Sequence, residues 1–196
     1  MKTLSALFCG LLLSALPVSL HAQQIQPGTF KIDKITPSII QTPQYQYSGE
    51  IRNPAGGQYG KWLEVEVQFE SLLDVSELTV KYYVLLNNQA QTVLYGEVTH
   101  VNVPKSHELY SVMYVSPRSL ASLFAGVPVT AGSAKVVGVQ LLVKGQVVAE
   151  TSSKASATGE WWGQYQQATG FMLNKNETPF APLYWDRYEA IKSAAH

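Results

Sequence analysis

Acidic side chains are the first residues whose spacing could support catalysis, because a glycoside hydrolase needs only two carboxylates at a defined separation. Glu64, Glu66 and Glu70 alternate with apolar residues, which predicts that their carboxylates share one wet face of a strand. Catalytic carboxylates normally occupy contrasting environments, and three like charges on a wet face offer no such contrast. Asp186 is a better local candidate, although an ion pair with a neighbouring arginine or lysine is its simpler interpretation.

The histidines and serines do not form a recognisable catalytic or metal-binding motif. The chain contains neither the G-x-S-x-G turn of a serine hydrolase nor two histidines four residues apart with a glutamate between them. His100 and His107, which precedes Glu108, fall on neighbouring predicted strands, where a surface metal contact is one interpretation. Two solvent-facing histidines at strand ends are the simpler one. We therefore expect no catalytic residue, no metal site and no cofactor.

Aromatic residues concentrate between positions 161 and 188, and they are the candidate binding residues. Trp and Tyr dominate the energetics of protein interfaces, and their rings also stack on sugar rings. The candidates for binding a partner protein or a glycan are Trp161, Trp162, Tyr165, Tyr184, Trp185 and Tyr188. The alternative is that this segment packs back over the fold and covers an open sheet face or edge.

The elements that must position these residues are short β-branched and aromatic runs separated by turn signals. Strands are predicted over residues 30–35, 45–51, 61–70, 78–86, 91–103, 107–115, 136–143 and 146–150. A change in alternation predicts a bulge near Gly96. A short helix is predicted to start at Ser116 and Pro117 and to end at Gly126.

This pattern predicts a mainly β fold, an immunoglobulin-like antiparallel β-sandwich with one short connecting helix, over residues 23–151. Residues 152–196 are predicted to form a linker and an aromatic-rich, partly helical C-terminal extension that packs on the sandwich. Helices are expected in this extension over residues 160–168 and 183–192.

Residues 1–22 have the features of a secretory signal peptide. Lys2 provides the basic start, the apolar run over 4–16 is too short to span a bilayer, and Ala22 provides a small residue for cleavage. An uncleaved anchor is the alternative interpretation. Cleavage would remove Cys9, the single cysteine, so the mature chain would have no disulfide. We expect an exported protein in the periplasm, on the outer-membrane surface or outside the cell, with no transmembrane span after cleavage.

The balance of charge excludes a typical nucleic-acid-binding protein. The chain has 14 Lys and Arg residues against 14 Asp and Glu residues, with a sequence pI of 6.9. A nucleic-acid-binding domain normally has a basic face and a high pI. The hydrophobic content of 46% is sufficient for a folded core, and 196 residues correspond to a single domain.

Two C-terminal segments, WWGQY at 161–165 and NKNETPFAPLYWDRYE at 174–189, resemble the tail of small exported proteins of verrucomicrobial bacteria. These proteins include a family that is encoded beside type IV pilus-like machinery in gut mucus-dwelling members. The resemblance implies an immunoglobulin-like fold and a role in envelope or pilus structure rather than in catalysis. A pilin itself would have a long N-terminal helix, and residues 23–27 (QQIQP) do not favour one. An accessory or surface role is therefore favoured over the pilus shaft.

Three functions follow from these observations. The first is a non-enzymatic envelope or cell-surface protein, a pilus-associated adaptor or structural component that contacts envelope or pilus proteins. The second is a carbohydrate-binding module for host or mucin-type glycans. The third is a secreted hydrolase, in which the carboxylates of Asp186, Glu64, Glu66 and Glu70 would be the candidate groups.

Overall fold

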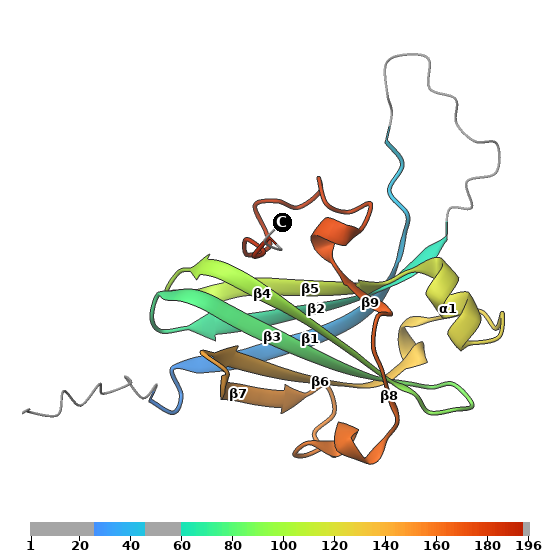
Figure 1. The fold of residues 1–196 in the computed structure, drawn as a ribbon, viewed down its shortest axis with the longest axis horizontal. Helices are drawn as coiled ribbons and strands as arrows, with labels where there is room; N and C mark the ends of the chain where they lie inside the picture. The colour runs from blue at the N-terminus through green and yellow to red at the C-terminus, as the bar shows by residue number, and fades with distance from the viewer. Residues whose placement is uncertain (1–25, 46–59, 194–196) are drawn as a thin grey trace, which may run out of the picture.

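The computed structural model describes residues 26–45 and 60–193 (Figure 1). The predicted signal peptide lies outside the described residues, as does the predicted strand 45–51 except for Tyr45, which is not in a strand. Two sheets pack face to face. The first sheet has the order β1 (Phe30–Gln41), β2 (Lys61–Ser71), β5 (Ser106–Val115) and β9 (Met172–Asn174). The second has the order β7 (Gln146–Ser152), β6 (Ala134–Val143), β3 (Val75–Leu86), β4 (Val93–Val103) and β8 (Gln167–Ala168).

The order of the first seven strands is that of an immunoglobulin-like sandwich. Strands β1, β2 and β5 form one sheet and β7, β6 and β3 form the other, as A, B, E and G, F, C do in immunoglobulin domains. The fourth strand pairs with β3 rather than joining the first sheet. All these pairings are antiparallel. The predicted fold class is therefore confirmed.

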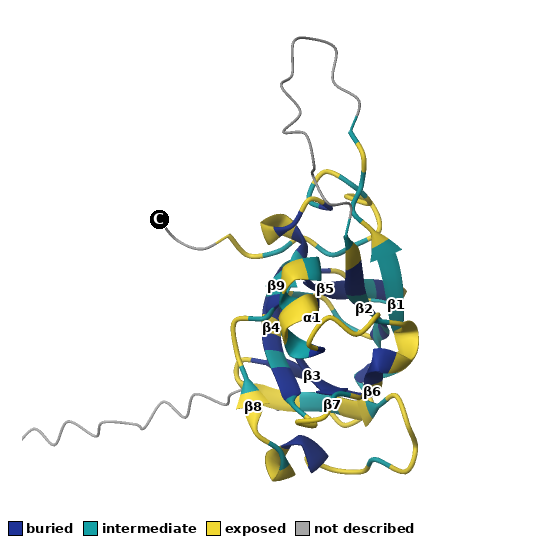
Figure 2. Ribbon diagram, turned by 90° about the vertical axis from the view of Figure 1, so that its right-hand side faces the viewer, coloured by how far each residue is buried: buried dark blue, intermediate teal, exposed yellow. Residues whose placement is uncertain are grey.

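The core lies between the two sheets and follows from the period-two pattern of the strands. Leu63, Val65, Val67 and Phe69 of β2 all point inward and have no exposed surface. Full burial of each such side chain stabilises the fold by about 1.5–3 kcal/mol. Figure 2 shows that buried residues concentrate on the central strands, whereas the edge strand β7 is largely exposed.

The predicted connecting helix is confirmed as α1 (Pro117–Leu123). The hydroxyl of Ser116 accepts a hydrogen bond from the amide of Ser119 at 3.2 Å, which caps the first turn. Leu120 points into the core, and the helix stops shortly before Gly126, which has a φ of +80°. Glycine adopts this left-handed backbone conformation without steric cost.

The bulge predicted near Gly96 is wrong, because β3 and β4 pair in continuous register from Glu77 and Val101 to Leu85 and Val93. Gly96 occupies an inward position, where an added Cβ would lie 2.6 Å from Cβ of Met172. The small residue at this position is explained by close packing of the C-terminal segment, not by an irregular backbone.

The C-terminal segment runs from the second sheet to the first and covers the side of the sandwich where β4 and β5 lie (Figure 1). Strand β8 pairs in parallel with residues 93–94 of β4, and β9 pairs with residues 113–115 of β5. Farther along, the amide of Val101 donates to the carbonyl of Ala190 at 2.9 Å. Unpaired strand edges promote aggregation, and this segment covers two of them.

The two helices expected in the C-terminal segment are wrong. The first is replaced by the 3₁₀ helix η2 (Trp161–Gln164) and by β8, and a further turn, η3 (Lys175–Glu177), follows β9. Residues 183–192 form turns, with Tyr184 at a φ of +53°, and then an extended end that bridges Ile191 to β4. Short helices are marginal in isolation, so contacts with the two sheets determine the path of this segment.

Candidate binding surface

The six candidate aromatic residues lie in two groups on opposite outer faces of the sandwich. Trp161, Trp162 and Tyr165 pack on the outer face of the second sheet, against β3, β4 and β6. The second group, Tyr184, Trp185 and Tyr188, belongs to the segment on the outer face of the first sheet. The structure therefore does not bring the six residues together into one platform.

The first group is part of the packing of the protein. Trp162 is 4% exposed and stacks on Tyr83, with ring centroids 4.1 Å apart and an interplanar angle of 6°. Its ring lies over Gly138 of β6, where any larger residue would meet it. The indole nitrogen of Trp161 donates to the hydroxyl of Ser152 at 2.8 Å. Buried and paired in this way, these two tryptophans offer little surface to a partner.

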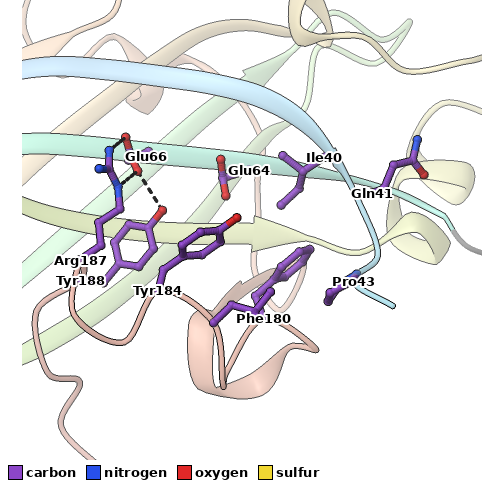
Figure 3. A pocket seen from close by; sticks show the side chains of 10 residues that line it. Ile40, Gln41, Pro43, Glu64, Glu66, Phe180, Tyr184, Arg187 and Tyr188 are labelled. Carbon is purple, nitrogen blue, oxygen red and sulfur yellow. Dashed lines mark hydrogen bonds and ion pairs between the residues drawn. The ribbon is translucent and has the colours of Figure 1, made fainter. Parts of the chain in front are cut away.

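A groove of about 450 Å³ lies between the outer face of the first sheet and the C-terminal segment (Figure 3). We call it the C-terminal groove. Strand β2, the end of β1 and the residues that follow β1 form one side of the groove. Residues 180–188 form the other side. Its lining residues are Ile40, Gln41, Pro43, Glu64, Glu66, Phe180, Leu183, Tyr184, Arg187 and Tyr188.

Glu66 anchors the C-terminal segment at one end of this groove. Its carboxylate accepts hydrogen bonds from Nε and Nη2 of Arg187, each at 2.9 Å, and from the hydroxyl of Tyr188 at 2.8 Å. The guanidinium of Arg187 also lies over the ring of Tyr110, 4.0 Å from its centroid. Burial acts to raise the pKa of Glu66, but the hydrogen bonds from Arg187 and Tyr188 hold it below its ordinary value.

Glu64 lies two residues earlier on the same face and has a different environment. Burial raises the pKa of its carboxyl, and the hydroxyl of Ser38 donates to Oε1 at 3.0 Å. Among the residues that the structure describes, no ion pair includes Glu64. The expectation that the carboxylates on this strand share one environment is therefore wrong for Glu64 and Glu66. The contrast arises because Arg187 reaches one of them and not the other.

Tyr184, which lines the groove, and the next residue in the chain, Trp185, remain open to solvent. Trp185 is 81% exposed and Tyr184 is 55% exposed. The ring of Tyr184 contacts that of Tyr188 edge to face, with centroids 6.4 Å apart. Large exposed aromatic residues on a well-anchored segment are typical of interaction surfaces. Of the six candidates, these two have the exposure that binding requires.

Comparisons with known proteins agree with this fold. A protein-family model matches residues 21–195. The chain belongs to that family. A crystal structure of a protein from Akkermansia muciniphila, a verrucomicrobial bacterium, matches with a TM-score of 0.73 and 27% sequence identity. The match covers 85% of this chain and 94% of the other. No curated protein matches the sequence.

The remaining candidates for chemistry lie elsewhere on this family member. Asp186 is exposed and takes part in none of the ion pairs between described residues, so its expected pairing with a neighbouring base is wrong. His107 is exposed, and its Nδ1 lies 2.6 Å from a carboxylate oxygen of Glu70, with which it pairs when protonated.

In the described parts of the chain, no group of three or more acidic, histidine or cysteine side chains could hold a metal ion. Within the same residues, no helix is long and apolar enough to cross a bilayer.

His100 is buried, at 1% exposure, so the expectation of a solvent-facing histidine is wrong. Its Nδ1 donates to the carbonyl of Glu189 at 3.0 Å, because a carbonyl can only accept. Its Nε2 therefore accepts from the hydroxyl of Ser111 at 2.7 Å, and Ser111 accepts from Tyr82. Burial lowers the pKa of His100 to about 4. Ser111 and His100 resemble a nucleophile and its base, but Ser111 has no exposed surface. The hydrogen bond from His100 to Glu189 instead helps to hold the C-terminal segment.

Proposed function

We propose that this protein is a non-enzymatic, exported protein of the bacterial envelope or cell surface that binds a partner protein. The binding surface comprises the C-terminal groove and the exposed rings of Tyr184 and Trp185. The observation that carries the proposal is the 81% exposure of Trp185 on a segment that is anchored to the first sheet.

The anchoring matters because a rigid aromatic side chain loses little entropy on binding. Arg187 holds the segment to β2 two residues after Trp185, and Phe180 is buried against Trp62 and Tyr114 before it. The edge-to-face contact of Phe180 with Trp62 has a centroid distance of 5.5 Å. Trp185 is therefore presented between two fixed points of the surface.

The arrangement of polar groups also favours binding over catalysis. Glu66 is occupied by Arg187 and Tyr188, so it has no free oxygen to act on a substrate in this conformation. Ser111 and His100 are in hydrogen-bonding contact but lie beneath the C-terminal segment. The third function, a secreted hydrolase, therefore has the weakest support.

The finer proposal is that the partner belongs to the envelope or to pilus-like machinery. It is supported by the resemblance of residues 161–165 and 174–189 to a verrucomicrobial family encoded beside such machinery. The structural relative from Akkermansia muciniphila is compatible with that bacterial group. The predicted signal peptide over residues 1–22 supports export.

A photo-crosslinking amino acid at position 185 tests this proposal in the envelope of the producing bacterium. The matched control carries the same amino acid at Val147, which is 50% exposed on β7 of the other sheet. We expect a crosslinked envelope or pilus protein at position 185 and none at 147. Identical crosslinking patterns at the two positions would contradict the proposal.

The alternative function, glycan binding, is supported by the half-exposed ring of Tyr184 beside the carboxylate of Glu64 (Figure 3). The apolar face of an aromatic ring can stack on a sugar ring, and a carboxylate can accept hydrogen bonds from sugar hydroxyls. A glycan array tests it, and we expect no binding above background for the native chain. Binding that is lost in Tyr184→Ala would instead favour the carbohydrate-binding function.

A further inference from the structure

The groove contains a carboxylate that no cation within the described chain neutralises. Glu64 points into the groove from β2, and the hydroxyl groups that stabilise its charge, of Ser38 at 3.0 Å and of the neighbouring Tyr114, are both neutral. Glu66 and Arg187 neutralise each other through two hydrogen bonds at 2.9 Å. The lining residues therefore carry one uncompensated negative charge when Glu64 is ionised.

The walls around this carboxylate are mostly apolar. Ile40 and Pro43 lie on one side, and Phe180 and the ring of Tyr184 lie on the other (Figure 3). A volume of about 450 Å³ is within the ordinary range of small-ligand pockets. The groove thus combines apolar walls that can contact a hydrocarbon stem with a negative group that can pair with its end.

We propose that the C-terminal groove receives a lysine or arginine side chain of the partner protein. The methylene stem packs on Ile40, Pro43 and Phe180, and the charged end pairs with Glu64. The exposed rings of Tyr184 and Trp185 contact other parts of the partner chain. This inference rests on the proposed function and names the chemistry of the partner's anchor.

Charge complementarity favours a basic side chain over a sugar. A partly buried carboxylate without a cation is unfavourable, since burial removes water and returns no opposite charge. A docked cation restores that charge and makes charge-assisted hydrogen bonds, which are stronger than those to neutral hydroxyls. Long basic side chains also cover apolar surface with their stems while they place the charge at a polar partner.

The test uses small probes, Nα-acetyl-arginine amide and Nα-acetyl-lysine amide, with uncharged Nα-acetyl-norleucine amide as the comparison. Binding to the full chain is followed by shifts of backbone amide resonances in NMR spectra. We expect the basic amides to shift the resonances of Glu64 and Tyr184, and norleucine amide to shift neither. Binding should weaken as the salt concentration rises, which tests charge pairing without any substitution.

Two variants separate the groove from the rest of the strand. Glu64→Gln keeps the shape of the side chain and its hydrogen bond from Ser38, and it should weaken binding at least about tenfold. Glu70→Gln is the matched control, because Glu70 lies on β2 outside the groove, and it should bind as the native chain does. Thermal unfolding of both variants checks that they fold.

Equal binding of norleucine amide, or unchanged binding in Glu64→Gln, would overturn the inference. So would resonance shifts with galactose or N-acetylglucosamine and none with the basic amides, which would indicate a sugar site. A partner crosslinked at position 185 whose binding is insensitive to Glu64→Gln would leave the proposed function standing and refute the basic anchor. Probe binding without a position-specific crosslink would refute the protein partner instead.

Discussion

Arg187 and Glu66 are 121 positions apart in the chain and form a two-point ion pair, with Nε and Nη2 each 2.9 Å from a carboxylate oxygen. The pair joins the C-terminal segment to β2, an inner strand of the first sheet. It also gives Glu66 and Glu64 their different environments. The charge of the groove, and one of the contacts that anchor the segment, therefore depend on this arginine.

Arg187→Ala should lower the free energy of unfolding by about 1–2 kcal/mol, because the carboxylate of Glu66 would lose two hydrogen bonds while it stays partly covered. Urea unfolding measures this change. Lys192→Ala is the control, because the pair of Lys192 with Glu77 is about half exposed on both sides and should contribute under about 0.5 kcal/mol. Equal losses in the two variants would contradict the anchoring role of Arg187.

Gly138→Ala should destabilise the protein by about 1–3 kcal/mol through overpacking. An added Cβ would lie 2.5 Å from Cζ3 of Trp162, so the tryptophan would have to move off the sheet. Thermal unfolding and a red shift of the tryptophan fluorescence measure the effect. Gly163→Ala is the control, because a Cβ there meets no atom within 4 Å. A Gly138 variant as stable as this control would contradict the packing.

The sandwich could be predicted because its determinants are local. The alternation at Leu63, Val65 and Val67 indicates a strand with one buried face, and Ser116 with Pro117 indicates the start of a helix. Neither signal depends on a distant residue.

The groove could not be predicted, because its chemistry depends on contacts between distant parts of the chain. Which of Glu64 and Glu66 forms an ion pair with Arg187 depends on where the C-terminal segment lies. The sequence pattern of residues 183–192 predicts a helix, but contacts with the first sheet impose turns instead. The burial of His100 could not be predicted for the same reason, because the segment that covers it contains Glu189, 89 positions away in the chain. A glycine within a strand, such as Gly96, indicates close packing, but the sequence does not show that Met172 is the residue that packs there.

Trp162→Ala should destabilise the protein far more than Trp185→Ala. Removal of the buried Trp162 should cost about 3–5 kcal/mol of the free energy of unfolding, because a large cavity would remain against Tyr83. Removal of the exposed Trp185 should change it by less than about 0.5 kcal/mol. Urea unfolding measures both. A large loss of stability in Trp185→Ala would show that its ring packs on the protein, which would contradict its role as an interaction residue.

Because His100 is buried, we expect the protein to lose stability in mild acid. Burial lowers its pKa from 6.5 to about 4 in the folded protein, whereas the unfolded chain retains the ordinary value. The unfolded chain therefore binds a proton first, and stability falls as the pH drops from about 6.5 to about 4. The full effect is about 3 kcal/mol, and below pH 4 this group contributes no further change.

Other groups titrate in the same range, so the measurement is a difference between the native chain and His100→Gln. The lowered pKa of Glu66 also makes the protein less stable as the pH falls. Burial raises the pKa values of Glu64 and Glu189, so their protonation makes the protein more stable in acid. These contributions are shared by both proteins and cancel to first order. Urea unfolding from pH 7 to pH 4 should give a shallower decline for His100→Gln, although this variant is less stable at pH 7 because its hydrogen bonds to Ser111 and Glu189 are altered. Parallel declines would mean that His100 is protonated in the folded protein, and would contradict its role as a neutral link to the C-terminal segment.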